Sequence, residues 1–90
     1  MRSIVWTQPA LDDLTLIWLS ANSEERFAIT QSAEIVDRRL FARAETEGES
    51  RSYGLRIMFV APLAVTYHFD SLLDQVTVAR IRLSRKRRKP

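Results

Sequence analysis

The chain opens with a strand pattern and then becomes helical. Residues 4–6, Ile-Val-Trp, are a β-branched and aromatic run long enough for one strand. Pro9 follows at a place suited to the first turn of a helix, where a missing N–H is not needed. To about residue 21, apolar side chains then recur at helical spacing: Leu11, Leu14 and Trp18, with Leu16, Ile17 and Leu19 broadening the stripe. The pattern predicts a strand and a first helix.

A second helix is predicted to start at Asn22. The Asn22 side chain can accept a bond from the backbone of residue 25, and the Glu25 carboxylate can return one, which is the capping-box signature. Apolar positions then step by three or four residues to about residue 46: Ile29, Ala33, Val36, Leu40 and Ala44. Because the connection between the helices is short, we expect an antiparallel helical hairpin, followed by a loop at residues 47–52.

After Gly54 the apolar period changes to two, which predicts strands at residues 55–60, 63–70 and 75–83. If no bulge intervenes, one face carries Leu55, Ile57, Phe59, Leu63, Val65, Tyr67, Phe69, Ile81 and Leu83, and the hairpin should cover it. The opposite, open face would then carry Arg56, Thr66, His68, Asp70, Arg80 and Arg82. The predicted fold is α+β, in the order β-α-α-β-β-β, with a helical hairpin packed on a twisted, mainly antiparallel sheet.

Length and composition fit one small domain at residues 1–84 with a basic tail at residues 85–90. The 90 residues are 46% apolar and 28% charged. The absence of cysteine and the single histidine exclude a disulfide framework and a structural zinc site, and we expect no cofactor and no metal. Apolar runs are too short to span a bilayer, and no signal-peptide pattern follows Met1, so we expect a cytoplasmic protein without a membrane partner.

Charge is distributed unequally along the chain. Residues 1–50 hold five basic and nine acidic side chains, whereas residues 51–90 hold nine basic and two acidic ones. The run that begins Arg85-Lys86 gives a local field that attracts polyanions or an acidic protein partner. A solvated, solubilising tail explains the same run equally well.

The predicted open face carries the candidate chemistry. RNA cleavage needs an acid or base near neutral pH, which His68 offers, and cations beside the phosphate, which Arg56, Arg80 and Arg82 offer. An ordinary half-exposed strand position is the commoner explanation of one histidine, and Arg56 is equally suited to a structural ion pair. Two arginines at i and i+2 repel each other unless an anion or an acidic partner lies between them, so Arg80 and Arg82 favour an interaction role.

The order of elements, together with several local motifs, resembles the RelE/ParE superfamily of bacterial toxins. The motifs are Ala10-Leu11-Asp12-Asp13-Leu14 with Ile17-Trp18, Gly54-Leu55-Arg56, Pro62 with Val65-Thr66-Tyr67, and Val76-Thr77-Val78-Ala79-Arg80-Ile81. The resemblance covers about residues 2–85 and implies a small cytoplasmic toxin of a type II toxin-antitoxin, or plasmid stabilisation, system. It also implies neutralisation by a cognate acidic antitoxin that wraps the toxin; a heterotetramer is one arrangement of that complex.

The superfamily divides by mechanism. RelE-like members cut messenger RNA on the ribosome as mRNA interferases, with an arginine commonly just before the V-x-Y stretch and an aromatic or histidine near the C-terminus. Here the first position is Ala64, and no tyrosine or histidine follows Ile81. The resemblance therefore favours the ParE-like branch, which inhibits growth by binding DNA gyrase. Arg56, Arg80, Arg82, Arg85 and Lys86 are the predicted target- or antitoxin-binding residues.

Two alternatives stay open. A RelE-like ribosome-dependent mRNA endonuclease would use His68, Arg56, Arg80 and Arg82 as catalytic candidates. A non-toxic nucleic-acid or protein binding module would need only the basic surface.

Overall fold

The computed structural model describes residues 1–84 and confirms the predicted order of elements. One short strand and one turn of 3-10 helix occupy the segment predicted to be a loop. The elements are β1 (Ser3–Trp6), α1 (Gln8–Leu19), α2 (Ser23–Arg43), β2 (Glu49–Ser50), a 3-10 turn (Ser52–Gly54), β3 (Leu55–Val60), β4 (Leu63–Asp70) and β5 (Gln75–Leu83). The predicted basic tail, residues 85–90, lies outside the described residues.

The strands form one open sheet in the order β1-β5-β4-β3-β2. β1 runs parallel to β5, and every other neighbouring pair is antiparallel. Because β1 and β5 are parallel neighbours, the chain between them must cross over, and α1 and α2 lie in that crossover. The sheet is therefore mainly antiparallel, as predicted.

Both helices start where the sequence indicates. The Thr7 side chain accepts a bond from the Ala10 amide, 3.2 Å away, and caps α1. At α2 both capping-box bonds are present: the Glu25 amide donates to the Asn22 side chain at 2.9 Å, and the Asn22 amide donates to the Glu25 carboxylate at 2.8 Å. The two helices cannot merge, because the cap fixes a break between them.

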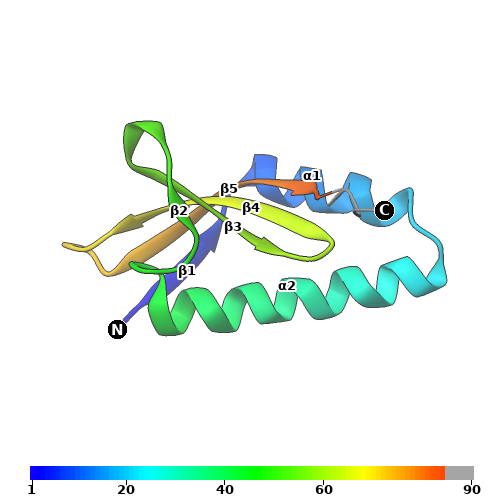
Figure 1. Ribbon diagram of the computed structural model, residues 1–90, viewed down its shortest axis with the longest axis horizontal. Helices are drawn as coiled ribbons and strands as arrows, with labels where there is room; N and C mark the ends of the chain where they lie inside the picture. Colours follow the sequence, from blue (N-terminus) through cyan, green and yellow to red (C-terminus); the bar gives the residue numbers. More distant parts are fainter. Residues whose placement is uncertain (85–90) are drawn as a thin grey trace, which may run out of the picture.

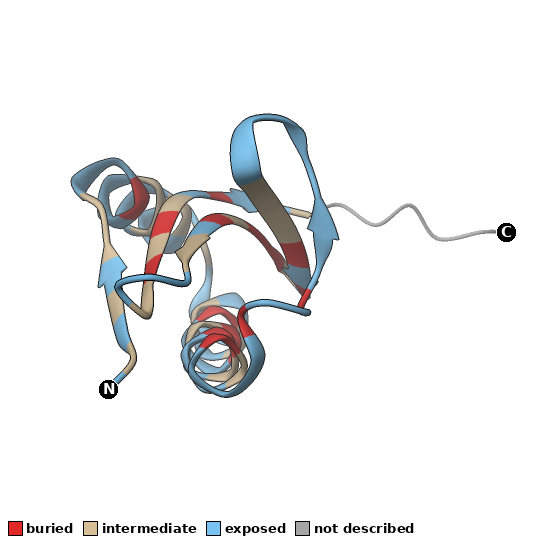
Figure 2. Cartoon of the chain, turned by 90° about the vertical axis from the view of Figure 1, so that its left-hand side faces the viewer, coloured by how far each residue is buried: buried red, intermediate tan, exposed pale blue. Residues whose placement is uncertain are grey.

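α2 lies across the concave side of the sheet, whereas α1 lies beside β5, beyond the end of the short β1 (Figure 1). Figure 2 shows the curved sheet closing over α2, with the buried positions between them. The core is formed by Ala10, Val36, Leu40, Ala44, Met58, Val60, Leu63, Val65, Tyr67, Val76, Val78 and Ile81. The core thus joins both helices to three strands.

The predicted helix faces need two corrections. In α1 the inward side is Ala10, with Leu14 and Ile17 packed against the core, while Leu11 and Trp18 are about two-fifths exposed. The inward stripe is therefore rotated by about one residue from the predicted one. In α2 the buried position is Ser32 rather than Ala33, because the Ser32 hydroxyl donates to the Val60 carbonyl of β3.

The predicted face of β3 is wrong. The turn at Ala61-Pro62 contains two residues, so Val60 pairs with Leu63 and Met58 pairs with Val65. Cross-strand partners share a face of the sheet. In this register, each even-numbered residue of β3 pairs with an odd-numbered residue of β4 and lies on the same face. Met58 and Val60 are accordingly buried. The predicted core residues of β3 lie on the open face instead: Leu55, Ile57 and Phe59.

The predicted alternation along β5 fails at one point as well. Thr66 pairs with Arg80, but the next residue of β4 pairs with Val78, so Ala79 is the extra residue of a bulge. The bulge reverses which positions face inward. Val76 and Val78 are therefore buried on the same side as Ile81, whereas Arg80 keeps its predicted place on the open face.

Candidate functional site

The open face of the sheet combines an apolar row with a polar row. β3 contributes Leu55, Ile57 and Phe59, and the polar positions of β4 and β5 are Thr66, His68, Arg80 and Arg82. The pairing sets Thr66 opposite Arg80 and His68 opposite Leu55. The structure therefore brings three of the four nuclease candidates onto one face, as predicted, and leaves out the fourth, Arg56.

Arg80 is already paired within the chain. Its guanidinium donates to both carboxylate oxygens of Asp13 in α1, at 2.8 and 3.0 Å, and the Ile81 amide donates to the same carboxylate at 2.9 Å. The bonds from Arg80 lower the pKa of Asp13 and raise the pKa of Arg80. The acidic partner that the arginine pair was expected to need is thus α1 itself. Asp13 also accepts a hydrogen bond from the Ile81 amide of β5, which lies beyond the part of β5 that pairs with β1.

His68 and Arg82 have no such partners among residues 1–84. His68 is exposed, and the nearby carboxylate of Asp70 is used elsewhere: its Oδ1 accepts bonds from the Leu72 and Leu73 amides at 3.0 and 3.1 Å. Asp70 therefore shapes the β4–β5 turn and does not orient His68. A general base needs a neighbour that fixes its tautomer and direction, and the described residues supply none to His68.

Arg56 lies on the core side of the sheet, contrary to the prediction, because it pairs with the inward-facing Tyr67. Its Nε donates to the Glu47 carbonyl at 2.8 Å, and its two terminal nitrogens donate to the Ser50 hydroxyl and the Gly48 carbonyl at 2.9 and 3.2 Å. These bonds tie the segment after α2 to β3. Arg56 is thus a structural residue in this fold.

A buried carboxylate stabilises the same corner. Glu47 is 7% exposed, and its side chain accepts from Arg39 at 2.6 and 3.1 Å and from Arg43 at 3.3 Å. The bonds from Arg39, followed by the charges of Arg39 and Arg43, hold the pKa of Glu47 below its ordinary value. The fully buried Tyr67 hydroxyl lies 2.7 Å from the Glu47 carbonyl and 2.8 Å from the Ala44 carbonyl. The corner between α2 and β2 is therefore held through both the side chain and the backbone of Glu47.

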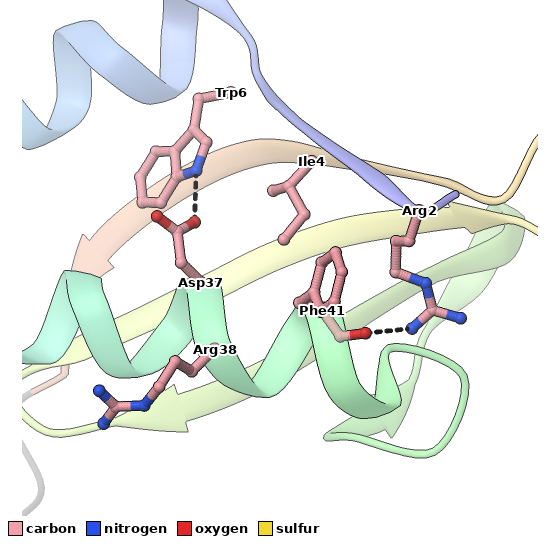
Figure 3. A pocket seen from close by; sticks show the side chains of 6 residues that line it. All are labelled: Arg2, Ile4, Trp6, Asp37, Arg38 and Phe41. Atoms are coloured by element: carbon pink, nitrogen blue, oxygen red, sulfur yellow. Dashed lines mark hydrogen bonds between the residues drawn. The ribbon is translucent and has the colours of Figure 1, made fainter.

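Two of the clefts in the described part of the chain lie away from the open face. One, of about 540 Å³, runs between β1 and α2, and Figure 3 shows its lining: Arg2, Ile4, Trp6, Asp37, Arg38 and Phe41. In it the Trp6 indole donates to Asp37 at 3.0 Å. The other, of about 720 Å³, is lined mainly by apolar and small side chains where α1 meets α2, including Ile17, Ala28, Pro62 and Leu83. The residues that line it come from α1, α2, β5 and the connections between elements, so the sequence alone did not indicate it.

The remaining predicted binding residues, Arg85 and Lys86, lie outside the described residues. Within residues 1–84, no group of three or more histidine or acidic side chains is placed to hold a metal ion. No helix of this part is long and apolar enough to cross a membrane. Among residues 1–84, the open face thus presents an imidazole without an orienting partner, His68, and a guanidinium without a hydrogen-bond partner, Arg82.

Comparison with solved structures gives the fold. A chain of the chromosomal ParDE toxin-antitoxin system from P. aeruginosa is 21% identical, with a TM-score of 0.74 over 93% of this chain and 97% of that one. A chain of the toxin-antitoxin complex RelBE2 from Mycobacterium tuberculosis is 15% identical, with a TM-score of 0.67 over 91% and 90%. A chain of the E. coli DinJ-YafQ complex is 13% identical, with a TM-score of 0.65 over 92% and 93%.

No protein-family model and no curated protein matches the sequence. The chain therefore has the fold of these toxin-antitoxin structures, which confirms the resemblance at the level of the fold. At these identities, the fold is what the comparison shows.

Proposed function

We propose that this chain is the toxin of a type II toxin-antitoxin system that acts in the cytoplasm. It arrests growth by binding an essential target, DNA gyrase, and is neutralised by a cognate acidic antitoxin. The observation that carries the proposal is the similarity to the ParDE chain, which extends over nearly the whole length of both proteins. The similarity does not identify a catalytic residue. The choice between binding and cleavage therefore depends on the side chains of the open face.

The open face supports binding over cleavage. Strand cleavage of RNA by a positioned base needs an oriented acid or base together with cations that are free to meet the phosphate. Arg56 is turned to the other side of the sheet, Arg80 is held by Asp13, and His68 lacks an orienting neighbour among the described residues. A toxin that acts by binding does not require any of these groups to be free.

The apolar cleft at the α1–α2 junction supports the antitoxin part of the proposal. Its lining includes the small residues Ala21, Ala28 and Ala61, which leave room for bulky apolar side chains of a second chain. Ser84 also lines this cleft, and the basic run begins at the next residue. An antitoxin segment with apolar and acidic side chains fits both features, because it would fill the cleft and meet the cationic run. A heterotetramer of two such pairs belongs to the same proposal.

A RelE-like mRNA endonuclease is the second candidate, and one observation favours it. His68, Arg80 and Arg82 do share the open face, so binding to the ribosome with its mRNA could free Arg80 from Asp13 and complete a site. The surface of such a site would also suit a non-toxic module that only binds nucleic acid.

Two assays on the purified protein separate these functions. In the first, DNA gyrase supercoils a relaxed plasmid with rising amounts of the chain; we expect loss of supercoiling and accumulation of broken DNA. In the second, ribosomes translate a defined mRNA, and we expect it to stay intact. His68→Ala and Arg82→Ala serve as matched variants of the open face and should inhibit gyrase as the wild type does. If the wild type cleaves the mRNA and either variant does not, the chain is an endonuclease and the gyrase proposal is wrong.

A further inference from the structure

The turn between β4 and β5, residues 71–74, displays two neighbouring leucines to solvent. We call it the leucine turn; Leu72 is 95% exposed and Leu73 is 67% exposed. Turn positions favour glycine, proline, asparagine, aspartate and serine. Single exposed apolar residues are common, but here two adjacent ones stand at the tip of a hairpin, at the end of the molecule opposite the α1–α2 connection (Figure 1). The cleft assigned to the antitoxin does not include them, and no residue has yet been assigned to contact with the target.

The leucine turn is held in place by several independent bonds. The Asp70 carboxylate accepts from both leucine amides, at 3.0 and 3.1 Å. Asp74 has a φ of 52°, in the left-handed region, and its carbonyl accepts from the first residue of β1 at 3.1 Å. Its carboxylate also accepts from Arg2 at 3.0 Å. A surface ordered before binding loses less conformational entropy when it docks, so this turn is suited to act as a binding element.

Exposed carboxylates flank the leucine turn. Asp74 and Glu45 both bond Arg2, but the side chain of Arg2 is only 13% exposed, whereas those of Asp74 and Glu45 are 43% and 53% exposed. Asp70 adds a third carboxylate next to the leucines. These three carboxylates disfavour nucleic acid and anionic lipid at the leucine turn itself. A protein surface with basic side chains around an apolar pocket is complementary to it.

We propose that the leucine turn is the element by which the toxin docks on its protein target, with Leu72 and Leu73 entering an apolar pocket rimmed by basic side chains. This proposal rests on the proposed function, since it names the surface through which the toxin reaches its target. It places the target contact on the β4–β5 turn, away from the open face and from the cleft assigned to the antitoxin. The acidic rim steers the approach, and the leucines supply the buried area.

The test is growth arrest by induced expression without an antitoxin, calibrated by the amount of toxin per cell. The variant Leu72→Ser/Leu73→Ser should need roughly tenfold more protein than the wild type to arrest growth, as expected on removing a central apolar contact. The control is Leu16→Ser/Leu19→Ser, two leucines of α1 that are 65% and 60% exposed. It should arrest growth as the wild type does. Leu72→Gln alone, at the most exposed position, is the second variant should the double variant fold poorly.

The outcomes are separable. A wild type that does not arrest growth overturns the proposed function. A wild type that arrests growth, with leucine-turn variants that are folded by circular dichroism and equally toxic, overturns the docking proposal alone. Glu45→Lys decides the chemistry of the partner: weaker arrest supports a basic rim, whereas stronger arrest indicates a polyanionic target and overturns the proposal. Sedimentation that shows wild-type dimers and monomeric leucine-turn variants would make a second copy the occupant, which also overturns it.

Discussion

Replacing Arg56 distinguishes a structural arginine from a catalytic one. Its guanidinium makes three hydrogen bonds to the segment that joins α2 to β3, and the bond to the Glu47 carbonyl, at 2.8 Å, lies beside the buried Tyr67 hydroxyl. Arg56→Ala removes all three bonds and leaves the Glu47 carbonyl, whose bond is part-buried, without this donor. We expect a loss of about 2–4 kcal/mol of unfolding free energy, because a hydrogen bond to a charged group contributes about 1.5–3 kcal/mol and the two more exposed bonds contribute less.

The size of the effect is measurable. Such a loss is a large fraction of the roughly 5–15 kcal/mol that stabilises a small domain, and it should lower the melting temperature by about 10–25 °C. Arg56→Lys should lose about half as much, because an ammonium group reaches one carbonyl where the guanidinium fork reaches several acceptors. Urea unfolding followed by tryptophan fluorescence measures both. Arg82→Ala, which removes an open-face arginine without a bond among residues 1–84, is the control and should change stability by less than about 0.5 kcal/mol.

The same variants test function separately from stability. Arg56→Lys, assayed at a temperature where it is fully folded, should arrest growth as strongly as the wild type. Unchanged stability of Arg56→Ala would refute the structural role. A folded Arg56→Lys that no longer arrests growth would return Arg56 to the functional surface.

Three further predictions concern the corner between α2 and β2 and the 3-10 turn that follows β2. The bonds from Arg39 hold the pKa of Glu47 below its ordinary value in the folded chain. Its stabilisation is therefore complete above the unfolded pKa and is lost as the pH falls through the folded pKa. Urea unfolding from neutral to acid pH should show a steeper loss of stability for the wild type than for Glu47→Gln. Gly48→Ala should cost about 3 kcal/mol or more, because Gly48 has a φ of 65° and an added Cβ would collide with the Ile57 carbonyl. Gly54→Ala should cost only about 1–2 kcal/mol by the same measurement, because the φ of 75° is strained but the added Cβ would make ordinary van der Waals contact with the His68 ring at 3.5 Å.

Residues close together in the sequence predicted the helices and the longer strands. Which face of each strand is buried depends on pairing between residues far apart in the sequence. Pro9 and the Asn22–Glu25 capping box lie at the first turns of the two helices, so these residues sufficed to place both starts. The face of β3 depends on which residue of β4 it pairs with, and the two-residue turn at Ala61-Pro62 sets a register in which Met58 turns inward. An alternating pattern with apolar residues on both sides, such as Leu55 to Val60, cannot reveal this choice.

The candidate site was predicted in part for a related reason. His68, Arg80 and Arg82 reach one face because β4 and β5 are paired there as expected. The bulge at Ala79 leaves no distinctive residue in the sequence, since alanine is compatible with either face. The pairing of Arg80 with Asp13 joins residues 67 positions apart, and no local pattern indicates such a contact.

The proposed function is that this chain arrests growth by binding DNA gyrase and not by cutting RNA. Its most direct test is pulse labelling after tightly induced expression in a bacterial host, with thymidine and amino-acid incorporation followed over the first minutes. Wild type and His68→Ala/Arg82→Ala should both stop thymidine incorporation first while translation continues. A first collapse of amino-acid incorporation, restored by the double variant, would contradict the account and establish the open face as a ribosome-dependent nuclease site.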